Sequence, residues 1–337
     1  MVTKKVFGIL PDGRFVHLLK IEAQGGRYAN ILTYGAALQA LVVPDKNGVP
    51  GDVVLGFDTF EGYLNDKDFH GRTVGRYANR IGGGGFMLGD AFYRVPENVN
   101  AVFLHGGGEF SGAIWDFEIS GEQSVTLSYT SPVSYGFPGR VRAQVTYTFD
   151  GSELNIDYFA KTDEPTVLNF TNHTYWTLNT YGEILRHILQ ADADFYQPID
   201  PRLLPDGEPC AVDGTPFDFR EATGLGERIR ERNTQLRLAD GYDHHFCLNS
   251  GGKVQVSSLS GRTLTMTTDM PGFQLYTGNF LSGKIGKRGR SLARRCGFCL
   301  ETQFPPDTPN SARAADCVFS PNRPYRSRTT YRFGVVE

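Results

Sequence analysis

Alternation of apolar and polar residues along short stretches is the dominant pattern of this chain. From Val141 to Phe149 the odd-numbered positions are apolar and the even-numbered positions are polar. Because side chains alternate across a strand, this pattern predicts a β-strand with one apolar face. Asp150-Gly151 is a turn signal, and the alternation resumes from Leu154 to Tyr158. The two runs together predict a β-hairpin.

The same pattern recurs along the chain. A second hairpin is predicted from Val254 to Leu259 and Thr263 to Thr268, and further strands are predicted over 38–43 and 125–129. Helical periodicity is scarce, and only a short surface helix over about Leu225 to Arg232 is expected. Many short strands with closely spaced turns are typical of an all-β sandwich or barrel. Since we find no internal repeat or break in composition, we expect residues 1–337 to form a single domain.

Charge and hydropathy exclude several partners. The chain of 337 residues has a formal net charge of −3, so no basic excess exists to bind nucleic acid. Eighteen apolar residues never run together, so no membrane span is expected. The most basic stretch, Lys284 to Arg295, is interleaved with Gly and Ser and is interpreted as a solvated loop.

The chain has five cysteines, and nothing at the N-terminus looks like a secretory leader. An odd count without a leader predicts reduced thiols and a cytoplasmic protein. Cys296 and Cys299 have the spacing of a zinc or redox motif, but no second such pair completes a tetrahedral site. We therefore interpret the cysteines as structural.

Five polar clusters stand among small and aromatic residues: Gly75–Ile81, Leu104–Gly107, Thr171–Trp176, Tyr242–Phe246 and Phe298–Pro305. Taken singly, each has a structural explanation: a hydrogen-bonded histidine, a surface arginine, or a buried carboxylate in an ion pair. Taken together, they contain what is needed to hold a sugar. Asp and Arg bind hydroxyls through charge-assisted hydrogen bonds, aromatic rings cover the C–H face, and His and Glu supply an acid and a base.

Two of these clusters contain strand-like alternation. If Phe298–Pro305 is a strand, Glu301 shares its face with Cys299 and Gln303 and points away from Leu300 and Thr302. In the same way, His244 and His245 point to opposite faces, so at most one of them faces a given site.

The order of the motifs resembles that of the aldose 1-epimerase (galactose mutarotase) family, over nearly the whole chain. The motifs that carry the resemblance are Gly75–Ile81, Leu104–Gly107, Phe137–Gly139, Thr171–Trp176, Gly241–Phe246, Pro271–Phe280 and Gly297–Gln303. The resemblance implies an all-β fold with few short helices, a large β-sandwich of the galactose mutarotase-like supersandwich type. It also implies a site in an open cleft across one sheet.

The resemblance also implies residue roles. Glu301 is expected to be the base that takes the proton of the C1 hydroxyl, and His173 the acid that protonates the ring oxygen. His105 is expected to orient the substrate. The sugar-binding residues implied by matching position are Asn79, Arg80, Asp243 and Gln274.

The implied reaction opens and recloses a sugar ring by proton transfer alone. No redox step or phosphate enters, so no cofactor and no metal are expected, and the spacing of the candidate residues shows no three-ligand metal set. The expected partner is a small aldose, galactose or glucose, bound by a monomer or homodimer.

Three other functions compete with an aldose 1-epimerase. A hexose-6-phosphate mutarotase would need Arg or Lys where Asp243 stands, since a carboxylate repels a phosphate. A glycoside hydrolase or lyase would need a second carboxylate opposite Glu301, and Asp243 is the candidate. A non-catalytic sugar-binding module would keep Arg80 and Asp243 without needing both His173 and Glu301.

Overall fold

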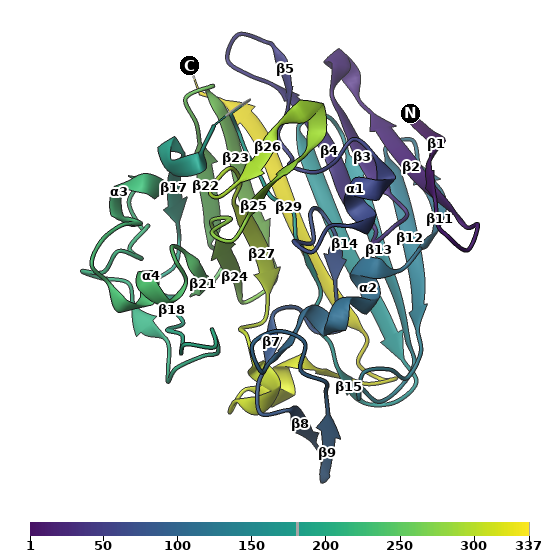
Figure 1. Ribbon diagram of the computed structural model, residues 1–337, viewed down its shortest axis with the longest axis vertical. Coiled ribbons are helices and arrows are strands. Elements are labelled where there is room, and N and C mark those ends of the chain that lie inside the picture. Colours follow the sequence, from purple (N-terminus) through teal and green to yellow (C-terminus); the bar gives the residue numbers. More distant parts are fainter. Residues whose placement is uncertain (180–181, 337) are drawn as a thin grey trace.

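Strands dominate the structure, as the alternation predicts. The computed structural model describes residues 1–179 and 182–336. The largest sheet has nine antiparallel strands in the order β11 (Asp116–Gly121), β12 (Ser124–Ser131), β13 (Val141–Phe149), β14 (Glu153–Thr162), β29 (Tyr325–Val335), β23 (Arg262–Thr268), β22 (Lys253–Ser257), β17 (Ile188–Ala191) and β20 (Thr223–Gly224). It forms the back layer of the molecule in Figure 1.

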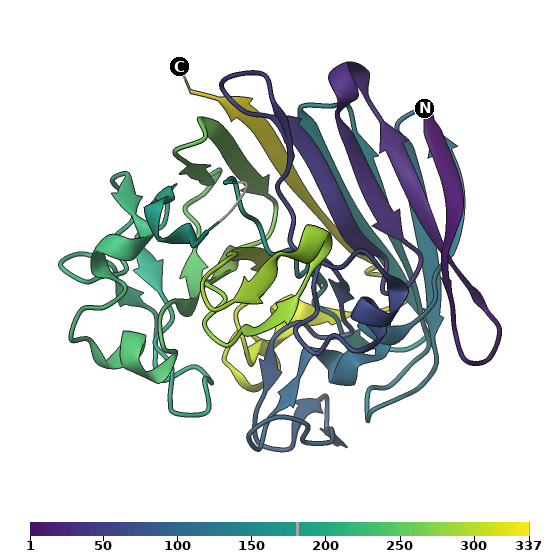
Figure 2. The same ribbon diagram turned by 45° about the horizontal axis from the view of Figure 1, so that its top comes forward.

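Two five-stranded sheets lie against this layer (Figures 1 and 2). The N-terminal sheet has the order β1 (Val2–Ile9), β2 (Phe15–Glu22), β3 (Tyr28–Leu32), β4 (Ala37–Pro44) and β5 (Pro50–Asp52). The other, called here the site sheet, has the order β19 (Cys210–Ala211), β18 (Phe195–Tyr196), β21 (Asp243–Cys247), β24 (Gly272–Tyr276) and β27 (Cys299–Gln303).

Short elements connect and cover these sheets. The strand pairs are β6 (Thr73–Val74) with β16 (Thr171–Asn172), β7 (Arg80–Ile81) with β10 (Phe103–Leu104), β8 (Gly85–Leu88) with β9 (Ala91–Arg94), β15 (Thr166–Val167) with β28 (Val318–Phe319), and β25 (Ser282–Ile285) with β26 (Ser291–Ala293). The helices are α1 (Phe60–Leu64), α2 (Glu109–Gly112), α3 (Leu225–Arg228) and α4 (Thr234–Leu238). The 3₁₀ turns are η1 (Gln24–Gly26), η2 (His105–Gly108), η3 (Ile184–Arg186), η4 (Lys287–Gly289), η5 (Thr308–Asn310) and η6 (Ala314–Cys317).

One continuous core lies between the layers. It joins Val125 and Val145 of the nine-stranded sheet to Leu38 of the N-terminal sheet and to Phe273 and Leu300 of the site sheet. The arrangement is a β-sandwich with few short helices, as expected. Because the apolar face of the site sheet is turned into this core, its polar face is turned outward.

Both predicted hairpins are confirmed, as β13–β14 and β22–β23, and the strands predicted over 38–43 and 125–129 lie within β4 and β12. The predicted helix is shorter than expected: α3 ends at Arg228, and α4 is a separate helix. Within the described residues, no helix has the length and apolar character needed to cross a membrane.

The basic stretch Lys284–Arg295 is not a solvated loop. It contains the hairpin β25–β26, and Lys287 Nζ lies 2.6 Å from Asp52 Oδ2. Arg295 is buried as well. The interpretation from sequence was wrong because it counted charges without a partner in a distant strand. The five cysteines are free thiols, and Cys296 and Cys299 are both buried.

Candidate active site

The polar face of the site sheet forms the floor of the site. In the strand register, His245 pairs with Gln274 and Gln274 pairs with Glu301. Directly paired residues of antiparallel strands point to the same face. Asp243, two residues from His245, shares this face, whereas His244 points into the core against Phe217. The alternation predicted for both clusters is therefore confirmed, and His245 is the member of the His244-His245 pair on the floor.

Glu301 is a buried carboxylate at the centre of β27, the edge strand of this floor. The residue is 2% exposed, and within the described residues its Oε2 atom has no hydrogen-bond partner. Burial raises the pKa of Glu301 well above its ordinary value, the nearby Asp243 adds to this, and Arg80 opposes it. A carboxylate with a raised pKa binds a proton more tightly, which is the property that a base requires.

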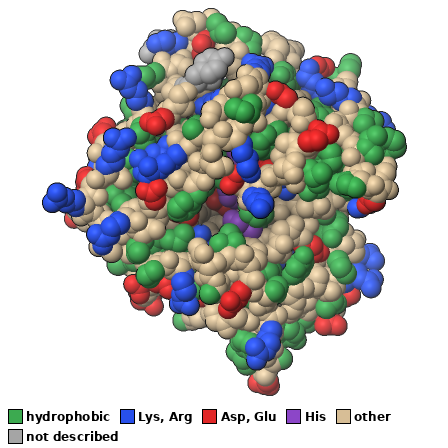
Figure 3. Space-filling model, in the orientation of Figure 1, with side chains coloured by type: hydrophobic (Ala, Val, Ile, Leu, Met, Phe, Trp, Pro, Cys, Tyr) green, Lys and Arg blue, Asp and Glu red, His purple; other side chains and the backbone are tan. Residues whose placement is uncertain are grey.

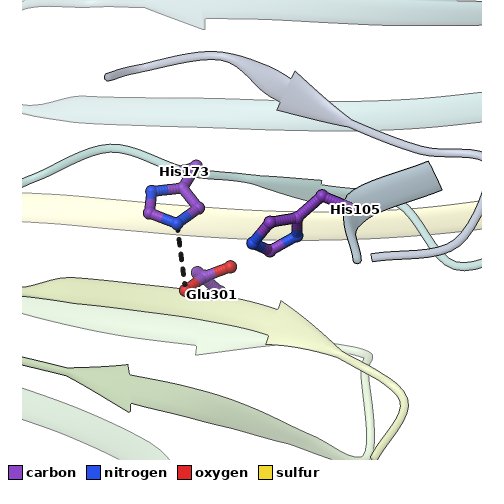
Figure 4. A group of neighbouring side chains, drawn as sticks. All are labelled: His105, His173 and Glu301. Atoms are coloured by element: carbon purple, nitrogen blue, oxygen red, sulfur yellow. Dashed lines mark ion pairs between the residues drawn. The ribbon is translucent and has the colours of Figure 1, made fainter. Parts of the chain in front are cut away.

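His173 stands over Glu301. It follows β16. Its main-chain N–H donates to Arg72 O and its C=O accepts from Gly71 N–H, so the backbone of His173 is held against residues 71–72. Its Nε2 atom lies 3.7 Å from Glu301 Oε1 (Figure 4). Burial lowers the pKa of His173 to about 4. The imidazolium form of this residue is therefore a strong acid.

His105 completes the group drawn in Figure 4. The pairing of Leu104 with Arg80 brings η2 beside residue 79, and the main-chain N–H of Asn79 donates to Nδ1 of His105 over 3.2 Å. A backbone N–H is always a donor, so Nδ1 must stay unprotonated and the proton of neutral His105 sits on Nε2. Burial, with His173 and Arg80 nearby, lowers the pKa of His105 well below its ordinary value.

A glycine permits the close approach of η2 to the segment that carries Asn79. Gly106 has φ of 59°, and a Cβ atom at this position would overlap the carbonyl of Gly75. A side chain here would be both strained and in steric conflict. The Leu104–Gly107 and Gly75–Ile81 motifs are therefore two halves of one local structure.

The four predicted sugar-binding residues lie together. Gln274 donates to Asp243 Oδ1 over 2.7 Å, Arg80 Nη2 lies 3.8 Å from Asp243 Oδ2, and Arg80 Nη1 donates to Asn79 Oδ1 over 3.1 Å. Burial raises the pKa of Asp243, and Arg80 and Gln274 oppose the shift. Arg76, in the same motif as Arg80, instead binds Ser131 and Pro138 and has a structural role.

Aromatic side chains border the site. Tyr175 lies 5.0 Å from His173 between ring centroids, whereas Trp176 packs against Tyr331 in the core. Phe69 contacts both catalytic candidates, with centroids 4.9 Å from His105 and 6.0 Å from His173. Sequence reasoning missed Phe69, because it lies in an irregular segment with a positive φ and belongs to none of the motifs. In Figure 3, histidine side chains are visible at the bottom of a hollow near the centre of the face shown.

The structure brings together a three-ligand set that sequence spacing did not reveal. The ligand atoms of His105, His173 and Glu301 all lie within 4.8 Å of one another. Histidines that bind metals usually donate their other ring N–H to an acceptor. Here Nδ1 of His105 accepts from Asn79 instead, which leaves the Nε2 proton in the direction of the other two groups. The donor set therefore fits hydrogen bonding to a ligand better than metal coordination.

A second such group, Asp66, Asp68 and His70, is also brought together. Its carboxylates already face cations, since Arg72 lies 3.4 Å from Asp66 and Lys284 lies 3.4 Å from Asp68. His70 Nδ1 lies 3.0 Å from Asp66 Oδ1. These pairs explain why the three side chains lie together, and His70 stacks on Tyr175 at the border of the site.

A buried histidine–carboxylate pair beside a row of hydrogen-bonding side chains, on the outer face of a β-sandwich, is an arrangement suited to a carbohydrate-active enzyme. Comparisons with known proteins specify the family. The profile described as Aldose 1-epimerase matches residues 17–332. Galactose mutarotase of Bos taurus is 37% identical over 99% of both chains, and aldose 1-epimerase of Escherichia coli (strain K12) is 32% identical over 96% of this chain and 97% of its own.

Solved structures agree. The crystal structure of galactose 1-epimerase from Lactobacillus acidophilus superposes with a TM-score of 0.89 at 26% identity, covering 100% of this chain and 99% of that one. A homologue from C. elegans gives a TM-score of 0.88 at 30% identity, covering 95% and 99%. The chain belongs to the aldose 1-epimerase family, and the family expected from sequence is confirmed.

Proposed function

We propose that this enzyme interconverts the α and β anomers of galactose or glucose, with Glu301 as base and His173 as acid. The observation that carries the proposal is the position of His173 Nε2, 3.7 Å from Glu301 Oε1, above the hydroxyl-binding row of the floor. The names of the relatives, galactose mutarotase and aldose 1-epimerase, support the sugar class.

The reaction follows from the pair. Glu301 takes the proton of the C1 hydroxyl, the C1–O5 bond breaks, O1 becomes the carbonyl oxygen, and Nε2 of imidazolium His173 protonates O5. Rotation about C1–C2 presents the other face of the carbonyl. Ring closure then reverses both proton transfers: His173 takes the proton back from O5, and Glu301 returns its proton to O1.

The pKa shifts favour the intermediate. At the open-chain stage Glu301 is protonated and His173 is neutral. These are the states favoured by a raised pKa at Glu301 and a lowered pKa, about 4, at His173. The site therefore stabilises the protonation pattern that follows ring opening, which lowers the cost of the difficult step.

Only one of the two histidines can act as the acid. An acid must hold protons on both ring nitrogens before it donates one. Nδ1 of His105 faces the donating N–H of Asn79, so a second proton there would lose that hydrogen bond. His105 is therefore suited to donate from Nε2 to a sugar oxygen throughout the reaction, and His173 is left to transfer the proton.

Polarimetry of freshly dissolved α-D-galactose tests the proposal, with D-glucose, glucose 6-phosphate and an aryl glycoside as comparisons. We expect accelerated mutarotation of galactose or glucose. Acceleration with glucose 6-phosphate alone would assign the enzyme to phosphosugars, and release of the aryl group would assign it to hydrolysis. Binding of galactose without acceleration would show a sugar-binding module.

A further inference from the structure

Cys299 contacts the proposed acid. It lies at the start of β27, two residues before Glu301 on the same face of the site sheet, and it is fully buried. Its Sγ atom lies 3.6 Å from Nδ1 of His173. Nδ1 is the nitrogen that does not face Glu301, so the thiol and the carboxylate contact opposite edges of one ring.

We propose that Cys299 is a positioning residue, whose thiol holds the His173 ring toward Glu301 in both of its protonation states. The proposal rests on the proposed function, because it takes His173 as the residue that gains and loses a proton. A thiol suits this task because it can donate through S–H or accept at sulfur, and rotation about Cβ–Sγ switches between the two.

The thiol can meet every protonation state of His173. As the imidazolium, His173 carries a proton on Nδ1, which sulfur accepts. After Nε2 has given its proton to O5, Nδ1 still carries a proton and the same contact remains. When the neutral ring instead carries its proton on Nε2, Nδ1 becomes an acceptor and the S–H group donates. The ring keeps one orientation throughout.

A neutral partner also preserves the strength of the acid. A carboxylate beside Nδ1 would stabilise the imidazolium by an opposite charge and weaken it as a proton donor. The Cys299 thiol stays uncharged, because burial, with Glu301 and Asp243 nearby, raises its pKa well above the ordinary value. The two histidines thus differ in their Nδ1 partners. Nδ1 of His173 faces a thiol that can either donate or accept a hydrogen bond, whereas Nδ1 of His105 faces a backbone N–H that can only donate.

The test compares Cys299→Ala, Cys299→Ser and the control Cys296→Ala. Cys296 is a buried thiol three residues away, in the same apolar cluster as Cys299 but outside β27. We expect Cys299→Ala to lower kcat about two- to tenfold, the worth of a weak hydrogen bond, with KM unchanged. Cys299→Ser, which keeps a donor and acceptor, should recover most of that loss, and Cys296→Ala should match the wild type.

Nitrogen NMR of ¹⁵N-histidine-labelled enzyme supplies a readout that does not depend on turnover. We expect the Nδ1 resonance of His173, assigned with His173→Asn, to shift in Cys299→Ala and to stay in place in Cys296→Ala. Unchanged kcat and an unchanged Nδ1 resonance in Cys299→Ala would overturn the proposal. Equal losses in both alanine variants would also overturn it, as simple loss of packing. An inactive wild type would instead refute the proposed function.

Discussion

In the proposed mechanism the burial of Glu301 favours proton transfer, although it lowers stability, since a buried carboxylate without a full set of partners is costly. We expect Glu301→Gln, which keeps the shape but cannot take a proton, to lower kcat by about 10²–10⁴. Galactose affinity should stay within a few-fold, because the hydroxyl-binding row is intact. Polarimetry and a galactose titration measure the two quantities.

The pH profile of the same variant gives a second measure. The reactive pair holds one proton in total, so in the wild type kcat/KM should rise with pH as the doubly protonated pair loses its first proton near pH 4. It should fall again, above the ordinary glutamate range, as the pair loses its second proton at the raised pKa of Glu301. This falling limb should be missing in Glu301→Gln. A variant that keeps more than a tenth of the wild-type kcat would sink the assignment of the base, whatever its stability.

The two histidines should respond differently to the same substitution. Asn keeps an N–H donor but cannot transfer a proton. His173→Asn should therefore lose about 10²–10⁴ in kcat while galactose still binds. His105→Asn should lose much less, because donation to a sugar oxygen is its whole task. The kcat values of both variants, measured together with the stability of each, distinguish the acid from the hydrogen-bond donor. Equal losses would contradict the distinction drawn from their Nδ1 partners.

At the scale of elements, the strands that carry the floor could be read from sequence. Alternation around Glu301 correctly placed Cys299 and Gln303 on its face, and it separated His244 from His245. The β-branched and aromatic positions of β13 and β14 were equally clear. These elements are long enough for a period of two to show, and their registers follow from burial of one face.

The elements that position His105 and His173 could not be predicted from alternation. β6, β7, β10 and β16 have two residues each, which is too few for any periodicity. They form because distant segments meet, and the contact between Asn79 N–H and His105 Nδ1 depends on that meeting. The motifs located His105 and His173. The proximity of His105, His173 and Glu301, and the contacts of Phe69 and Cys299 with the histidines, depend on tertiary structure.

One such long-range contact gives a prediction about β7. Asp307 N–H donates to Arg80 O, and Gly82 N–H donates to Asp307 Oδ1 over 2.9 Å. Asp307→Ala removes the acceptor and places Ala at φ of 55°, so Arg80 should lose its fixed position. We expect KM to rise about 10- to 150-fold, the range for a lost charge-assisted hydrogen bond, with a smaller change in kcat.

Asp307→Asn is the matched variant, because Asn keeps an acceptor and tolerates the left-handed conformation. It should retain a KM near that of the wild type. Steady-state mutarotation over a range of galactose concentrations gives both constants. If Asp307→Ala left KM unchanged, the segment after β27 would have no part in placing Arg80.

At the scale of the whole molecule, the sandwich lets a polar face become buried. The core behind the site sheet fixes β21, β24 and β27, while the short strand pairs cover their outer face. The same burial affects histidines that do not face the site. His187 lies near Leu178, and His244 lies against Phe217, and burial lowers the pKa of these two to about 4 and about 3.

This burial predicts instability in mild acid. Burial lowers the pKa of five histidines: His105, His173, His187, His244 and His245. Between their folded values and about 6.5, the unfolded chain binds protons that the folded chain does not, so stability falls as the pH falls. Asp243, Glu301 and Asp307, whose pKa values burial raises, act in the opposite direction.

Because the five histidines outnumber the three carboxyl groups, the free energy of unfolding should fall as the pH falls from about 6.5 to 5. Urea denaturation at several pH values measures this slope. His187→Gln removes one buried histidine outside the site and should flatten the slope by about 1.4 kcal/mol per pH unit. The variant should also be less stable at pH 7, because His187 Nε2 accepts from Leu178 N–H and Nδ1 faces Ile184 O. The slope, and not the absolute stability, is therefore the decisive quantity. A free energy of unfolding that stays level from pH 7 to 5, or an unchanged slope in His187→Gln, would show that these histidines take up no protons on unfolding.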